Sequence, residues 1–108
     1  MSIYIPTPEE LEVKYEPNTI ILLRQLKIPD NLQGFPYLTT AITHTAANPS
    51  QTFLVTKELY PYIARIFNST GYRVERNSRH AIQIGWQSGM RKPLEQIAKT
   101  SISQRPVN

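Results

Sequence analysis

The side chains best suited to chemistry lie close together in the second half of the chain, between residues 72 and 88. The long hydrogen-bonding side chains of this stretch are Tyr72, Arg73, Glu75, Arg76, Arg79, His80 and Gln83. On a helix, at about 100° per residue, all of them except Glu75 share one side, with Arg73 at its edge. Arginine pairs with guanine or clamps phosphate, glutamine pairs with adenine, and Glu75 can accept from a cytosine amino group. The pattern therefore predicts a helix that lies in the major groove of double-stranded DNA.

The other side of this predicted helix carries small and apolar residues. They are Val74, Ser78, Ala81, Ile82 and Gly85, with Trp86 at the border. A helix with one apolar stripe and one polar face packs its stripe against the protein core. We therefore expect these residues to be buried and the basic face to point outward.

The segment before this helix predicts the first helix of a helix-turn-helix. Residues 57–68 carry apolar side chains at helical spacing, and Ser69-Thr70-Gly71 forms a tight connection. Ala64 is small and Val74 is branched, so the two helices can cross closely. The motif is expected over about 57–88, with residues 72–88 as the helix that enters the major groove.

Weaker signals predict the remaining helices. Asn18 can cap a first helix that ends before Pro29, a second helix runs near 36–47, and a short helix covers 93–100. Proline lacks an N–H group, so Pro61 must lie in the first turns of its helix, or that helix begins near Tyr60.

The predicted fold class is all-α, a compact domain of about five helices that contains the helix-turn-helix. Residues 1–18, with three prolines, are expected to form an acidic, short extended N-terminal arm. Residues 19–102 would form the helical DNA-binding domain, and residues 103–108 a flexible tail.

Composition and charge agree with one small nucleic-acid-binding domain. The chain has 108 residues, of which 40% are hydrophobic and 19% charged, as in ordinary globular proteins. The net charge of +4 is unevenly spread: residues 1–18 hold four glutamates against one lysine, whereas residues 65–92 hold six basic residues against one glutamate. The basic half is expected to attract a polyanion.

The sequence also argues against several classes of protein. The chain has no cysteine, no apolar run long enough for a bilayer and no secretory signal, so we expect a cytoplasmic protein without membrane contact. His44 has no second metal ligand at a suitable spacing and is expected to make a local hydrogen bond. No catalytic triad or glycine-rich phosphate loop is present, so we expect no enzyme, no catalytic residue, no metal and no cofactor.

Several stretches of the sequence resemble the C-terminal effector domain of the stage-zero sporulation protein A family. They are Leu59–Asn68, Arg73–Arg76, Arg79–Ile82, Trp86 and Gly89, and upstream Ile28-Pro29, Gly34–Leu38, Ala41-Ile42 and Lys57. The resemblance spans roughly residues 19–102, and it extends to a proline inside the third helix. It implies an all-helical domain that binds a short bacterial promoter element through its fourth helix.

Within this resemblance Glu75, Arg76 and Arg79 match the family's groove-facing residues, and Arg73 and His80 lie beside them as base or phosphate contacts. Two departures stand out. Asn77-Ser78 replaces a small-apolar pair and puts a hydroxyl on the packed side, and Tyr72 replaces a small residue at the helix start.

The resemblance leaves the biological role open. Family members usually carry an N-terminal receiver domain, for which the segment before Thr19 is too short, so we expect a stand-alone domain without phosphorylation control of that kind. The family's domain also ends in a further helix that supports tandem dimers, and the sequence ends near its expected start. The main prediction is a sequence-specific transcription regulator. The alternative is a protein-interaction module that antagonises a full-length regulator or contacts RNA polymerase, and a homodimer on DNA also stays open.

Overall fold

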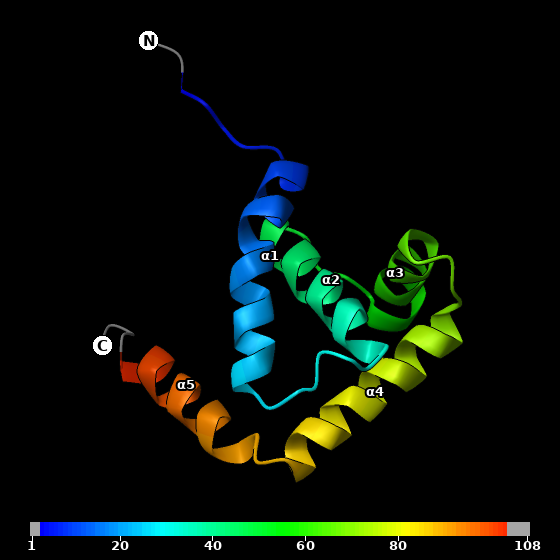
Figure 1. Ribbon diagram of the computed structural model, residues 1–108. Helices are drawn as coiled ribbons and strands as arrows, with labels where there is room; N and C mark the ends of the chain where they lie inside the picture. Colours follow the sequence, from blue (N-terminus) through cyan, green and yellow to red (C-terminus); the bar gives the residue numbers. More distant parts are fainter. Residues whose placement is uncertain (1–2, 104–108) are drawn as a thin grey trace.

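The structure is a computed structural model that describes residues 3–103. Its helices are α1 (Pro8–Gln25), α2 (Gly34–Ala47), a π-helical turn η1 (Val55–Leu59), α3 (Tyr60–Ile66), α4 (Gly71–Gln87) and α5 (Arg91–Ser103). No strand occurs within this range, so the all-α prediction is confirmed. Figure 1 shows α2 between α1 and α3, with α4 running below them and α5 turning back from the end of α4.

Helix α4 joins the two halves of the hydrophobic core. Ala81, which is fully buried, packs in one cluster with residues from α1, α2 and the α4–α5 connection. Val74, also fully buried, packs in a second cluster with residues from α2, η1 and α3. Because one helix contributes to both clusters, the body of the protein fixes the position of α4 along most of its length.

The structure corrects the prediction of an extended arm over residues 1–18. Residues 3–7 form neither helix nor strand, but α1 begins at Pro8 and continues past residue 18. The Thr7 side chain caps the helix by accepting a hydrogen bond from the Glu10 N–H at 3.2 Å. Proline at the first helical position costs no hydrogen bond, and two glutamates in the first turn favour the positive end of the helix dipole.

Asn18 is therefore not a cap, and Pro17 lies inside α1. Proline inside a helix removes the bond to the carbonyl four residues earlier, here that of Val13. Val13 and Pro17 are both exposed, so water can reach that carbonyl. Exposure on the outer side of α1 explains how the helix accommodates this proline.

The remaining helices follow the predictions with shifted ends. Helix α2 begins at Gly34 rather than Pro36, and α5 extends beyond the predicted 93–100. Helix α3 begins at Tyr60, as required by Pro61, and a π-helical turn precedes it. The predicted tail 103–108 lies outside the described residues except for Ser103, which ends α5.

Three helices end in the same way, with a left-handed residue after the last turn. These residues are Lys27 after α1, Asn68 after α3 and Gly89 after α4, with φ of 66°, 51° and 110°. In each case the next N–H bonds back five residues to a carbonyl of the helix, as in a Schellman motif. Each helix therefore stops at a defined residue, and the direction of the following segment is set.

His44 ties α2 to α1 and α3, in place of the predicted local hydrogen bond. Its Nδ1 lies 2.6 Å from Oε1 of Glu12 on α1. Its ring stacks on Tyr62 of α3 with ring centroids 3.9 Å apart, and Phe53 lies 5.0 Å away. This contact joins residues 32 positions apart in the chain and stabilises the packing of the first three helices.

Tyr62 gives this cluster a dependence on alkaline pH. Burial raises the pKa of the Tyr62 phenol, the carboxylates of Glu12 and Glu9 raise it further, and Arg65 lowers it. A folded pKa above the unfolded value of about 10 stabilises the fold below that pH, and this contribution is lost as the pH rises through the folded value. We expect the Tm of Tyr62→Phe, which keeps the stacked ring, to fall less steeply above about pH 10 than that of the wild type. If the Tm of the two proteins fell equally steeply with rising pH, this assignment would be contradicted.

Candidate nucleic-acid interface

Helices α3 and α4 and the turn between them form the predicted helix-turn-helix. Asn68 adopts the left-handed conformation that asparagine tolerates, and the Ser69 N–H bonds to the Ala64 carbonyl at 2.8 Å. Thr70 then caps α4 by accepting from the Arg73 N–H at 3.2 Å. The cap and the helix ending together fix the direction in which α4 leaves α3.

The inward side of α4 is built from small residues. Val74, Ser78, Ala81 and Gly85 are buried. Ala64 of α3 is buried in the same cluster as Val74, so the two helices pack against each other at the small and the branched residue. Small residues at successive turns let the backbones of neighbouring helices approach α4, which leaves its long side chains for the outer side.

The outer side of α4 presents the predicted contact residues. Tyr72, Arg73, Arg76, Arg79, His80 and Gln83 are exposed, and Glu75 is half-buried at the flank. Arg76, Asn77, Arg79, His80 and Gln83 line a shallow polar hollow on this side. The side chains that the sequence placed on one face therefore do lie together, and all of them belong to α4.

Positive charge dominates this outer side. Arg79 Nη1 lies 3.3 Å from Oε1 of Glu75, one turn away, and water reaches both side chains, which are 60% and 44% exposed. An exposed pair of this kind contributes about 0.3–0.5 kcal/mol, so a stronger partner can replace it. Among residues 3–103, Arg73 and Arg76 have no acidic partner within salt-bridge distance. Their charges are therefore available to an anionic ligand.

Arg73 lies at the end of α4 where a basic residue is unfavourable. It lies in the first turn of α4, which contains no acidic residue, whereas α1 carries two glutamates there. The N-terminus of a helix is its positive end, so an arginine at this position is unfavourable unless a negative partner approaches.

The structure corrects one expectation about α4. Ile82, predicted to be buried, is 44% exposed; Trp86, predicted to lie at the border, is 54% exposed. Ile82 borders a groove between α2, η1, α3 and α4. Sequence reasoning missed this groove, because its walls come from elements separated along the chain.

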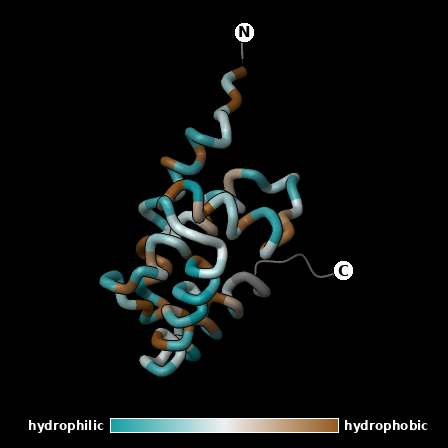
Figure 2. The backbone as a smooth tube through the Cα atoms, turned by 90° about the vertical axis from the view of Figure 1, so that its right-hand side faces the viewer, coloured by the Kyte–Doolittle hydropathy of each residue, from teal (hydrophilic) through white to brown (hydrophobic). Residues whose placement is uncertain are grey.

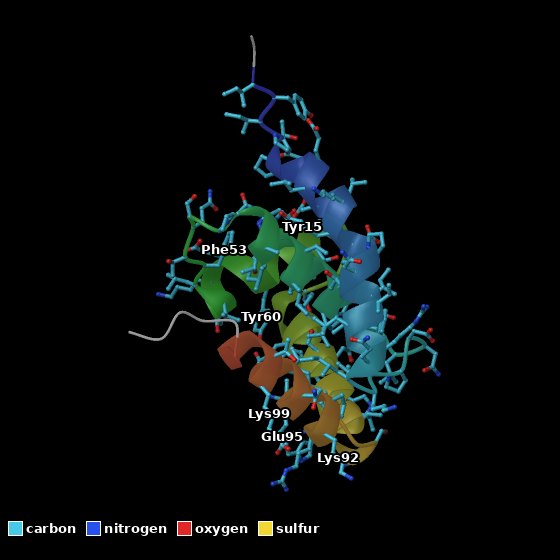
Figure 3. The ribbon with its side chains drawn as sticks, turned by 90° about the vertical axis from the view of Figure 1, so that its left-hand side faces the viewer. Tyr15, Phe53, Tyr60, Lys92, Glu95 and Lys99 are labelled. Carbon is cyan, nitrogen blue, oxygen red and sulfur yellow. The ribbon has the colours of Figure 1, made fainter. Side chains whose placement is uncertain are left out.

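A second basic surface lies on α5. Lys92, Glu95 and Lys99 are exposed and stand on the outer side of this helix (Figure 3). Arg91, in the first turn, pairs with Glu95 through Nε and Oε1 at 3.0 Å. Lys92 and Lys99 therefore add positive charge on α5, apart from that on α4.

Two further observations concern other kinds of site. Within residues 3–103 no three histidine or acidic side chains lie together as a metal site would require. In the same range no helix has the length and apolar character needed to cross a membrane.

Comparison with known families agrees with this arrangement. The sequence matches the family described as Sporulation initiation factor Spo0A C terminal over residues 19–108, which is most of the chain. This family is a DNA-binding domain of a sporulation transcription factor and not an enzyme family, which supports DNA binding in general. An all-helical body that presents a basic helix on its surface, together with this match, shows that the chain belongs to the family of Spo0A C-terminal domains.

Proposed function

We propose that the chain is a sequence-specific transcription regulator that binds double-stranded DNA with α4 in the major groove. The observation that carries this proposal is the outer side of α4, where three arginines face solvent on a helix whose other side is anchored in the core. Such a regulator acts on the chromosome, so a cytoplasmic location is part of the proposal.

The dimensions of α4 support this mode of binding. A helix with its side chains is about 10–12 Å wide, and the major groove of B-DNA is about 12 Å wide. Helix α4 has 17 residues, so it is about 25 Å long and can follow the groove over several base pairs. Arg76, Arg79 or His80, and Gln83 lie on successive turns of its outer side.

The chemistry of each side chain suggests its role. Arg76 and Arg79 suit guanine, Gln83 suits adenine, and Glu75 can accept from a cytosine amino group once its bond to Arg79 is exchanged. Arg73 and His80 suit phosphate oxygens at the groove edges. Tyr72, 69% exposed in the first turn, can lie against a sugar. Phosphate contacts fix the register of the helix, and base contacts select the sequence.

Selection of bound fragments from random DNA is the direct test of this proposal. We expect a short motif to be enriched, and a single wrong base pair in it to cost about 1–3 kcal/mol in a fluorescence anisotropy titration. Affinity should also fall with added salt, with a slope in log K against log salt of about −0.9 for each phosphate contact. Equal binding to all fragments, or no dependence on salt, would contradict specific recognition by α4.

The alternative function is a protein-interaction module that antagonises a related regulator or contacts RNA polymerase. Exposed apolar side chains, among them Ile82 on α4 and Val55 beside it, favour it. The two functions differ in the same selection. The interaction module would retain DNA weakly and without sequence preference, and would bind purified polymerase or regulator with an affinity that Ile82→Ser lowers.

A further inference from the structure

An apolar groove runs beside the outer side of α4. Its apolar lining consists of Leu38, Ala41, Val55, Leu59, Ile63 and Ile82. The hollow measures about 430 Å³, which is within the usual range of ligand pockets and can hold several side chains. Val55 and Ile82 at its rim are 48% and 44% exposed, so the groove is open to an incoming apolar segment.

The same chain carries an apolar segment that its own body leaves uncovered. Ile3, Tyr4 and Ile5 are 86%, 72% and 78% exposed. We call residues 3–7, which precede α1, the arm. Figure 2 shows hydrophobic residues in this arm, which stands away from the rest of the molecule. Three consecutive exposed apolar residues are unfavourable in a soluble domain unless they bind something.

The arm points away from the groove of the same molecule. The Thr7 cap begins α1, and Pro6 and Pro8 restrict the backbone on either side of it. Figure 1 shows the arm leaving the free end of α1, whereas α3 and α4 lie on the other side of α2. A groove on a second copy of the chain meets no such restriction.

Shape and charge of the arm fit the groove of a second copy. In an extended segment Ile3 and Ile5 point to the same side, so both can enter one groove. Glu9 and Glu10, both exposed, follow within a few residues. Arg79 and Glu75 both border the groove and pair with each other at 3.3 Å, so the acidic turn would have to compete with Glu75 for Arg79, a weak i,i+4 pair.

We propose that two copies of this chain associate by inserting Ile3 and Ile5 of one copy into the α2–α3–α4 groove of the other. The acidic start of α1 then lies near Arg79 and covers part of the outer side of α4. Association and DNA binding therefore compete. This last consequence rests on the proposed function, whereas the association itself does not.

Sedimentation velocity of the full chain without DNA tests the association. We expect concentration-dependent dimers at low ionic strength, and weaker association with added salt because opposite charges contribute. The double variant Ile3→Ser, Ile5→Ser removes the inserted side chains, and Ile82→Ser removes part of the groove. All three positions are exposed or partly exposed, so the fold should persist. Each variant should weaken association by about tenfold or more.

Mixing the two variants separates this contact from any other. The arm variant keeps an intact groove and the groove variant keeps an intact arm, so together they should form a mixed complex that neither forms alone. Val13→Ser, at a position 74% exposed on α1, is the matched control and should associate like the wild type.

Three results would overturn the proposal. The wild type could remain a monomer at every concentration, both variants could associate as strongly as the wild type, or the mixture could form no complex. A groove that binds RNA polymerase while the wild type stays monomeric would assign it to that partner instead. Dimers that form but leave DNA affinity unchanged would refute only the competition, and a failure to bind DNA would leave the sedimentation result intact.

Discussion

Gly34→Ala should destabilise the fold by about 3 kcal/mol, a large part of the total stability of a small domain. A Cβ at position 34 would lie 2.1 Å from the carbonyl oxygen of Asn77 and 2.8 Å from the Ala81 Cβ. The nearest atom belongs to the backbone of α4, so no side-chain rotation can relieve the contact. Helices α2 and α4 would have to separate, and the buried contacts of Ala81 would loosen.

Gly71→Ala is the matched control for this substitution. A Cβ at position 71 meets only the Tyr60 Cβ, at 3.9 Å, which is ordinary contact distance. Alanine favours a helix over glycine by up to about 1 kcal/mol, so this variant should be as stable as the wild type or more stable. Thermal denaturation should give a Tm at least about 10 °C lower for Gly34→Ala alone. Equal Tm values for the two variants would mean that α2 and α4 do not approach as closely as described.

The part of the site that lies on one helix was predictable from the sequence. Helix α4 was predicted within one residue at each end, because the tight connection Ser69-Thr70-Gly71 precedes it and its periodicity is strong. Each polar residue assigned to the outer side is exposed or at the flank. Periodicity fixes which residues share a face, and the small residues opposite fix which face is buried.

The first helix was predicted wrongly because proline has opposite effects at different positions. Pro8 favours the helix as its first residue, after the Thr7 cap and before two glutamates. Pro17 then suggested a break that does not occur. The starting signal was present in the sequence, but only the packing of α1 on α2 shows that the helix continues through Pro17.

The remaining errors concern contacts between distant parts of the chain. Ile82 lies at the edge of the apolar stripe of α4, and its exposure depends on how far α2 and η1 extend over it. The bond between His44 and Glu12 joins α2 to α1 over 32 positions. Local patterns carry no information about either, because both depend on the relative placement of helices.

Arg76→Ala should weaken binding to the selected DNA site by about 1–3 kcal/mol, or about 5 to 150-fold, and relax the preference at one base pair. Arg76 is exposed on the outer side of α4 and has no acidic partner among residues 3–103. Its removal should change the stability of the fold by no more than about 0.5 kcal/mol. Loss of affinity would therefore report a lost DNA contact rather than unfolding. Anisotropy titrations on the selected site and on single base-pair variants measure the loss of affinity and the loss of base preference.

Two further variants separate base recognition from general attraction. Arg24→Ala removes the same charge at an exposed position on α1, where Arg24 pairs with Asp30, and should leave the base preference unchanged. Arg76→Lys keeps the charge but loses the two-pronged hydrogen bonding of arginine.

If Arg76 pairs with a guanine, lysine should restore part of the affinity without the base preference. If Arg76 binds phosphate, lysine should restore most of the affinity, and Arg76→Ala should weaken all sites equally and flatten the salt slope by about 1. An Arg76→Ala protein that binds like the wild type at every site would contradict a role for Arg76 in DNA binding.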